Sequence, residues 1–298
     1  MYMDDSFSFE LASQQLYYPP YQCSFPSKQT SLLQLWDEIG LPHKRLKQLF
    51  SSPLTIIGFD VDPNAMSATL PDHKRKELVM HLWNFAGKGY QWSLHEFQQL
   101  AGWCEWSFNV FPLLKPGLSA VYEKICGKTQ LLAHLHGNNA IIHELWWMPD
   151  HVDHSPGLLF YKSLDFSPQS HDDVVAYTDA SGVGLGLWFP DEDFTCQCAL
   201  PKDGPNDTIF FTEALVVCSA IHAIQHMPKV PLRMLIYTDN TNVVATFNTL
   251  RAHPPYNTIL MSTVDVLIKH CVDLHVEHIS GSENIVADAL SHFQNERV

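Results

Sequence analysis

The sequence predicts an α/β protein whose C-terminal part is a mixed five-stranded sheet with flanking helices. Three observations predict this fold class. Apolar strand patterns at about 174–178, 184–189 and 194–200 precede a helical pattern at 211–227. Helical spacing dominates residues 71–160, and residues 54–70 have the pattern of a strand hairpin. A run of strands followed by alternating strands and helices is typical of an α/β domain with a mixed sheet.

The first 70 residues are predicted to hold little regular structure besides this hairpin. Residues 10–53 are polar and interrupted by prolines, with one helical piece at 31–39. Residues 54–61 form an apolar strand pattern, residues 62–65 (Asp-Pro-Asn-Ala) a turn, and residues 66–70 a return strand.

Two helices with recognisable ends follow the hairpin. The first begins at Pro71 and Asp72 and ends before Gly87. The second begins at Ser93, and Glu96 three residues later completes a capping box. Residues 117–160 are predicted to be mostly helical, and residues 165–173 are the expected linker.

Beyond the linker, strands and helices alternate. After the helix at 211–227 we expect a strand at 233–238, helices at 241–250 and 256–271, a strand at 272–279 and a last helix at 284–293.

Composition predicts a folded protein with an acidic C-terminal part. Hydrophobic residues make up 46% of the chain, and its formal net charge is −14. Residues 172–298 hold 16 acidic residues but only 6 Lys and Arg. This charge argues against a simple basic nucleic-acid binder, so a polyanionic partner would require metal ions or a basic surface.

The seven scattered cysteines are expected to be reduced intracellular thiols. No charged-then-apolar leader or long apolar run suggests secretion or a membrane span, so we expect a soluble intracellular protein without a membrane partner. The sequence does not distinguish cytoplasm from nucleus.

Four carboxylates form the strongest functional pattern: Asp179, Glu213, Asp239 and Asp288. Asp179 and Asp239 each follow Thr at the end of an apolar strand, where open α/β sheets form their sites. Glu213 and Asp288 lie on predicted helices. Taken singly, such acids are more often helix caps or first-turn acids. Taken together, they can hold the two divalent cations that phosphodiester cleavage uses.

The same residues carry a family resemblance. Tyr-Thr-Asp-Ala-Ser (177–181), Thr-Glu-Ala-Leu (212–215), Tyr-Thr-Asp-Asn (237–240) and His-Ile-Ser-Gly-Ser-Glu-Asn-Ile-Val-Ala-Asp-Ala-Leu-Ser (278–291) resemble a retrotransposon ribonuclease H domain. The resemblance implies that the four acids are catalytic metal ligands. It also implies two Mg²⁺ ions, with Mn²⁺ as the alternative, and endonucleolytic hydrolysis of the RNA strand of an RNA–DNA hybrid.

His278 is a further candidate catalytic residue. It stands ten residues before Asp288, the spacing of a mobile histidine in cellular ribonucleases H. The stretch from His278 to Gly281 aligns equally with a segment that precedes that histidine in those enzymes, and His278 would then be a strand-end residue. Both alignments remain open.

The N-terminal part resembles a reverse transcriptase. Tyr2, Met3, Asp4 and Asp5 resemble the Tyr-x-Asp-Asp hairpin of a polymerase palm, with Asp4 implied as a metal ligand. The whole chain is similar to a fungal retroelement polyprotein fragment. The implied domains are a partial palm (1–70), a helical thumb and connection (71–171) and a ribonuclease H-like domain (172–298).

Polymerisation is not expected, because a palm requires another aspartate and fingers that these residues do not include. We therefore expect Tyr2 to Asp5 to be a remnant motif. A complete reverse transcriptase or a second copy of the chain is a candidate partner. Two alternatives stay open: a catalytically silent fragment that binds nucleic acid or protein, and a degraded reading frame that is not stably expressed.

Overall fold

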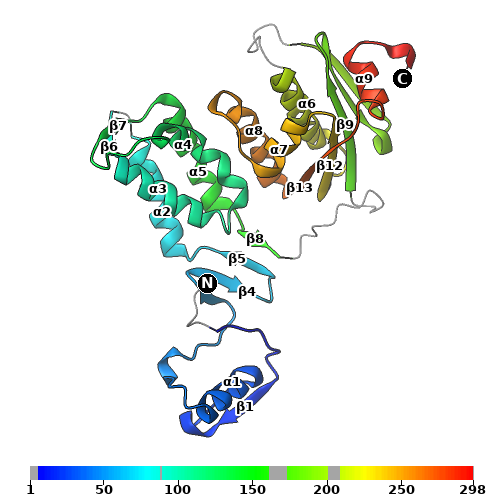
Figure 1. Cartoon of the computed structure of the whole chain (residues 1–298). Coiled ribbons are helices and arrows are strands. Elements are labelled where there is room, and N and C mark those ends of the chain that lie inside the picture. Colours follow the sequence, from blue (N-terminus) through cyan, green and yellow to red (C-terminus); the bar gives the residue numbers. More distant parts are fainter. Residues whose placement is uncertain (1–5, 88, 161–172, 201–208, 298) are drawn as a thin grey trace. The chain divides into compact units, whose positions relative to one another are not determined.

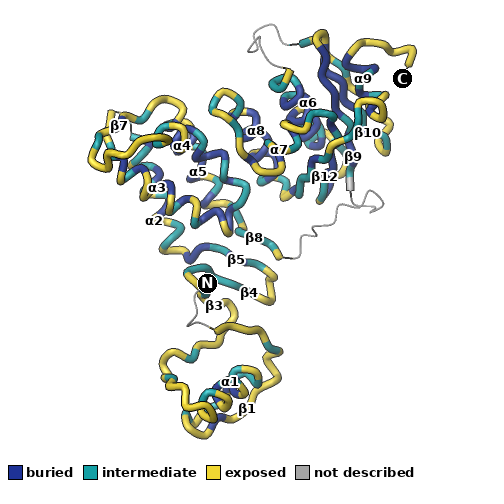
Figure 2. The backbone as a smooth tube through the Cα atoms, viewed as in Figure 1, coloured by how far each residue is buried: buried dark blue, intermediate teal, exposed yellow. Residues whose placement is uncertain are grey.

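The computed structural model describes residues 6–87, 89–160, 173–200 and 209–297 of the 298-residue chain. Contacts between Cα atoms divide the chain into two compact units: Met1–Lys74 with Pro156–Tyr161, and Arg75–Ser155 with Lys162–Val298. Figure 1 traces the elements along the chain, and Figure 2 shows where buried residues gather along it. All of the expected linker except Asp173 lies outside the described residues.

The first unit begins with a small α/β motif. The antiparallel strands β1 (Gln15–Tyr18) and β2 (Cys23–Pro26) precede helix α1 (Ser27–Glu38). Tyr18, Phe25 and Leu33 form its buried cluster. The helix was predicted, with a later start, but the hairpin was not. Its strands have only four residues each and lie among prolines, so the alternation that identifies a strand is too short to recognise.

A four-stranded sheet completes this unit, in the order β3–β4–β5–β8. Its strands are β3 (Leu54–Ile56), β4 (Phe59–Asp62), β5 (Ser67–Thr69) and β8 (Leu158–Leu159). The prediction of one strand over 54–61 was wrong, because Ile57 and Gly58 have φ angles of 49° and 84°. Two consecutive residues with positive φ make a tight hairpin turn, and β3 therefore folds back on β4.

The second unit begins with helices α2 (Asp72–Phe85), α3 (Leu94–Ser107), α4 (Ser119–Ile125) and α5 (Asn139–His154). A 3₁₀ segment, η3 (Pro112–Leu118), joins α3 to α4. The capping box of α3 is present as predicted: the Ser93 hydroxyl accepts from Glu96 N–H, and the Glu96 carboxylate accepts from Ser93 N–H. The region that was predicted as mostly helical also contains β7 (His134–His136), paired with β6 (Gln91–Ser93).

The predicted mixed five-stranded sheet is confirmed, in the order β11–β10–β9–β12–β13. Its strands are β9 (Asp173–Ala180), β10 (Gly184–Phe189), β11 (Phe194–Ala199), β12 (Arg233–Thr238) and β13 (Asp273–His278). The first three pair antiparallel, whereas β12 runs parallel to both β9 and β13.

Helices lie on both faces of this sheet. Figure 1 shows α6 (Ile209–Ala223), α7 (Thr241–Thr249) and α8 (Pro254–His270) on one side, and α9 (Ile285–Ser291) on the other. The stretch Ile209–His226 would be long and apolar enough to cross a membrane. It packs instead as a core helix, since Val216, Val217 and Ile221 are buried in the cluster that it shares with the sheet.

Polar contacts bind helix α8 to the helices that precede the sheet. Asn257 Nδ2 donates to Pro116 O and to Glu144 Oε1, at 2.7 Å each. Asp265 Oδ1 lies 2.7 Å from Trp147 Nε1 and 2.8 Å from His151 Nε2. The helical segment and the sheet therefore form one packed unit.

Candidate active site

Asp179 and Asp239 meet because their strands run in the same direction. Asp179 lies near the end of β9, and Asp239 directly follows β12. Tyr177 pairs with Tyr237, so the two aspartates stand level, each two residues further along. Parallel strands present their carboxyl ends at one sheet edge, which explains the juxtaposition.

Glu213 reaches the same edge from the first turns of α6. The residue is only 4% exposed. Its carboxylate has two weak partners, the backbone N–H of Ala180 and the Thr238 hydroxyl at 3.5 Å. Among the described residues no cation is an interaction partner of Glu213, so this buried acid faces mainly other acids.

Asp288 is brought to the site by three hydrogen bonds that join α9, with its N-cap Asn284, to the end of β9 and the residue after it, Ser181. Asn284 Nδ2 donates to Thr178 O at 2.9 Å, and Ser181 Oγ donates to Ser291 O at 2.8 Å. Ser291 Oγ lies 2.5 Å from Asp179 Oδ2 and donates to it. One serine thus connects the helix that carries Asp288 to the carboxylate of Asp179.

Two glycines of β10 allow α9 to lie directly on the sheet. A Cβ atom on Gly186 would stand 2.2 Å from Ala287 O and 2.6 Å from Ser291 N. A Cβ atom on Gly184 would stand 2.9 Å from Ser291 O. Any side chain at either position would push the helix away, and Asp288 with it.

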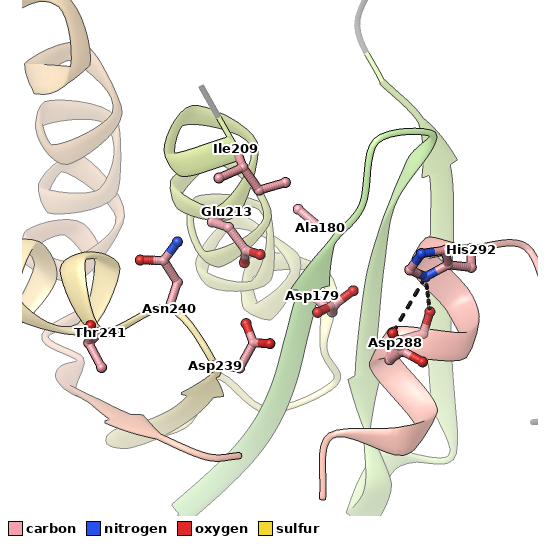
Figure 3. Close-up of a pocket in the computed structure, with 9 residues that line it drawn as sticks. All are labelled: Asp179, Ala180, Ile209, Glu213, Asp239, Asn240, Thr241, Asp288 and His292. Carbon is pink, nitrogen blue, oxygen red and sulfur yellow. Dashed lines mark hydrogen bonds and ion pairs between the residues drawn. The ribbon is translucent and has the colours of Figure 1, made fainter. Parts of the chain in front are cut away.

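The four carboxylates line one open pocket of about 470 Å³ (Figure 3). They come from four separate elements, and Figure 3 shows their side chains converging from the sheet edge, α6 and α9. The complete lining is Asp179, Ala180, Ile209, Glu213, Asp239, Asn240, Thr241, Asp288 and His292.

The electrostatics of the pocket are dominated by crowded acids, and the cations beside them, His292 and Arg297, pair with Asp288. Burial, and then repulsion from Asp179 and Asp239, raises the pKa of Glu213 to about 8. Burial also raises the pKa of Asp179, although the Ser291 hydroxyl favours its ionised form. Like charges this close disfavour ionisation, so bound cations would stabilise the ionised cluster.

The donor set fits divalent metal ions. The ligand atoms of Asp179, Glu213 and Asp239 lie within 4.8 Å of one another, and so do those of Asp179, Asp288 and His292. Carboxylate oxygens are the ligands that Mg²⁺ and Mn²⁺ prefer. Asp179 belongs to both groups and would bridge two ions.

The other predicted site residues lie elsewhere. His278 ends β13, paired with Thr238, and it is exposed and outside the residues that line the pocket. Tyr2, Met3, Asp4 and Asp5 fall outside the described residues. Sequence reasoning missed His292, although its position four residues after Asp288, one helical turn on, was a usable signal.

The comparisons with known proteins gave structural likenesses only. No protein-family model matches the chain, and no curated protein matches it.

One similar structure is LC11-RNase H1 in complex with an RNA/DNA hybrid. It has 18% identity and a TM-score of 0.35, and the match covers 39% of this chain and 92% of that one. RNase H1 from the archaeon Halobacterium salinarum has 16% identity and a TM-score of 0.35, over 42% of this chain and 99% of that one.

A longer match is the foamy viral protease-reverse transcriptase in complex with an RNA/DNA hybrid. It has 12% identity and a TM-score of 0.34, and it covers 91% of this chain. This chain spans 34% of the length of the foamy viral protein. The identities and TM-scores are low, and the convergence of the four carboxylates is independent of them.

Proposed function

We propose that the chain is a metal-dependent endonuclease that hydrolyses the RNA strand of RNA–DNA hybrids. The observation that carries the proposal is the convergence of Asp179, Glu213, Asp239 and Asp288, from four elements, on one open pocket. These are the acids at the matching positions of the four motif segments that resemble a ribonuclease H. An acid cluster whose burial opposes its own ionisation is typical of functional sites.

The roles of the residues follow from their positions. Two divalent ions would supply the positive charge that activates a water molecule and stabilises the leaving oxygen. The Ser291 hydroxyl donates to Asp179 Oδ2 and holds this oxygen in place. Asp179 would therefore set the orientation of the ligand cluster. Glu213 and Asp239 would hold an ion on the α6 side, and Asp288 would hold an ion on the α9 side. The open pocket admits a phosphodiester backbone from solvent.

A second pocket beside the carboxylates would grip a nucleic-acid strand. Its volume is about 550 Å³, and its lining includes Phe210, Arg251 and Tyr256. It lies near the first pocket, since two of its lining residues, Phe210 and Asn242, are chain neighbours of Ile209 and Thr241. Aromatic rings stack on bases, and an arginine contacts phosphate, so this lining suits a strand of the duplex.

The wider assignment is a retroelement-derived chain. We propose a palm-like part at 1–70, a thumb- and connection-like part at 71–171 and a ribonuclease H-like part at 172–298. The nuclease activity is proposed for the last part, because all four carboxylates lie there.

The deciding experiment is cleavage of an end-labelled RNA–DNA hybrid in Mg²⁺ or Mn²⁺. The chain should cut the RNA strand internally, and Asp239→Asn should abolish cutting. Asp191→Asn makes the same chemical change at an exposed position outside the pocket and should leave cutting intact. Equal cleavage by the chain and Asp239→Asn, or cleavage by neither, would refute the proposal. Tight hybrid binding in EDTA without cleavage would favour the catalytically silent binding fragment.

A further inference from the structure

His292 is a residue of the pocket that the four motif segments do not include. It lies one turn after Asp288, and its side chain is 44% exposed toward the pocket opening. In Figure 3 its ring stands above Asp288, on the same side of the pocket as Asp179. An imidazole beside two carboxylates changes the chemistry of that half of the site, because it adds a nitrogen donor.

The spacing of these three side chains suits a single ion. One ligand atom from each of Asp179, Asp288 and His292 lies within 4.8 Å of the others. Ligands on opposite sides of an ion with bonds of about 2.1 Å are about 4 Å apart. A small rotation of the exposed His292 and half-buried Asp288 side chains is therefore enough to close the group around one cation.

The second ring nitrogen of His292 has the environment of a metal-bound histidine. Nδ1 lies 3.0 Å from the backbone oxygen of Asp288, to which it donates when it carries the proton. Nδ1 also lies 3.1 Å from Ser291 Oγ. When Nδ1 carries the proton, Nε2 keeps a lone pair that a metal ion can accept. Metal-binding histidines commonly donate their other N–H to a backbone carbonyl in this way.

We propose that Asp179, Asp288 and His292 form a divalent cation site with an imidazole ligand, which favours Mn²⁺ over Mg²⁺. Mg²⁺ prefers oxygen ligands, whereas Mn²⁺ and later transition metals also accept imidazole nitrogen. The proposal deepens the proposed function, because it rests on Asp179 and Asp288 as ligands. It adds a ligand and a metal preference that the four acids alone do not imply.

The competing interpretation is an ordinary surface ion pair. His292 Nδ1 lies 3.5 Å from Asp288 Oδ1, and Arg297 Nη1 lies 3.7 Å from Asp288 Oδ2. Exposed pairs of this kind contribute little, so either cation can be displaced by a divalent ion. An ion pair and a metal ligand differ in one measurable property, the direct bond between metal and nitrogen.

Pulsed EPR of the Mn²⁺-loaded full chain tests this bond directly. A coordinated imidazole nitrogen modulates the Mn²⁺ spin echo, and we expect this signal in the unmodified protein. His292→Gln should remove it, and Mn²⁺ affinity at that site, measured by calorimetry, should fall by roughly tenfold or more. Asp288→Asn should remove the same signal.

His226→Gln is the matched control, because His226 is exposed and lies outside the pocket. It should keep both the signal and the affinity. A signal that survives His292→Gln, or its absence from the unmodified protein, would overturn the inference. The outcome is separable from the proposed function: a nitrogen signal without hybrid cleavage would support the site and reject the nuclease. Cleavage without the signal would support the nuclease and reject the metal site with an imidazole ligand.

Discussion

At the scale of single residues, the site depends on a hydroxyl as well as on four acids. Ser291 is fully buried, and its Oγ is close to both Asp179 Oδ2 and the backbone oxygen of Asp288. Asp179 Oδ2 is the closer of the two acceptors and is charged, so the hydroxyl donates its hydrogen bond to Asp179. Burial raises the pKa of Asp179, and the hydrogen bond from the Ser291 hydroxyl partly offsets this because it favours the ionised carboxylate.

Ser291→Ala should therefore weaken metal binding. A hydrogen bond to a charged group contributes about 1.5–3 kcal/mol, so Mn²⁺ affinity should fall by at least roughly tenfold. Calorimetric titration of the metal-free protein measures the change. Ser219→Ala removes an exposed hydroxyl that donates to Leu215 O on α6, and it should bind Mn²⁺ normally. Unchanged affinity in Ser291→Ala would show that Asp179 needs no such partner.

At the scale of elements, helix α9 lies close to the sheet because strand β10 has glycines, which carry no side chain, at the contact. The missing side chain at Gly186 leaves space for Ala287 O and Ser291 N against the sheet. This close approach makes Asp288 part of the pocket, since Asp288 lies on the same short helix.

Gly186→Ala should displace α9 and abolish cleavage. Overpacking at such a contact costs about 1–3 kcal/mol, so the melting temperature should fall, but the sheet should remain folded. Gly182→Ala is the matched control, because a Cβ atom there meets nothing within 4 Å. Thermal unfolding and hybrid cleavage, measured on both variants, separate the two effects. Full activity in Gly186→Ala would mean that α9 is not held as the structure shows.

A second feature at the scale of elements is Glu144, a buried acid on helix α5. Glu144 is 3% exposed and accepts from Ala120 N and Asn257 Nδ2, at 2.7 Å each. Burial raises the pKa of Glu144 to about 7, because these two donors only partly offset the loss of water.

Stability should therefore fall as pH rises through about 7. The pKa of Glu144 in the folded chain lies above its ordinary value of 4.5, so the folded chain holds a proton that the unfolded chain releases. The stabilisation is complete below pH 4.5 and is lost above about 7, a change of roughly 3 kcal/mol. Urea unfolding in EDTA at several pH values measures it.

Glu144→Gln should lack this component of the pH dependence, whereas Glu192→Gln, at an exposed position, should keep it. Comparing these variants isolates Glu144 from Glu213, whose raised pKa acts in the same direction. Identical pH profiles for Glu144→Gln and the unmodified protein would contradict the prediction.

At the scale of the whole molecule, the nuclease-like part is acidic and yet is proposed to bind a polyanion. Residues 172–298 carry 16 acidic residues and only 6 Lys and Arg. Arg251 is one of those six and lines the pocket beside the carboxylates. Its ion pair with Glu105, at 3.8 Å, is exposed on both sides and weak, so the guanidinium remains available to phosphate.

Arg251→Ala should weaken hybrid binding without slowing the chemical step. Loss of about 1 kcal/mol would raise KM roughly fivefold at unchanged kcat. The slope of log affinity against log salt should fall by about one, the change expected for one lost phosphate contact. Lys269→Ala removes an exposed cation outside both pockets and should change neither quantity. A lower kcat with unchanged KM would place Arg251 in another role.

Local pattern was sufficient for most elements of the second unit. The capping box at Ser93 and the strands ending at Thr178-Asp179 and Thr238-Asp239 are short-range signals, because propensity and alternation act over a few residues. The break at Ile57 was missed, since a positive φ at a β-branched residue contradicts its local preference. The β1–β2 hairpin was missed because its strands have only four residues each, too few for a recognisable apolar alternation.

By itself, the sequence determined the identity of the four carboxylates, their order, and the strand or helix that carries each. Only the tertiary structure decided which other residues share their pocket. His292 joins through one helical turn, and Ser291 reaches Asp179 from 112 positions away. His278 stays outside, at the end of β13. The physical reason is that the packing of α9 against two glycines is a long-range contact, and no local preference encodes it.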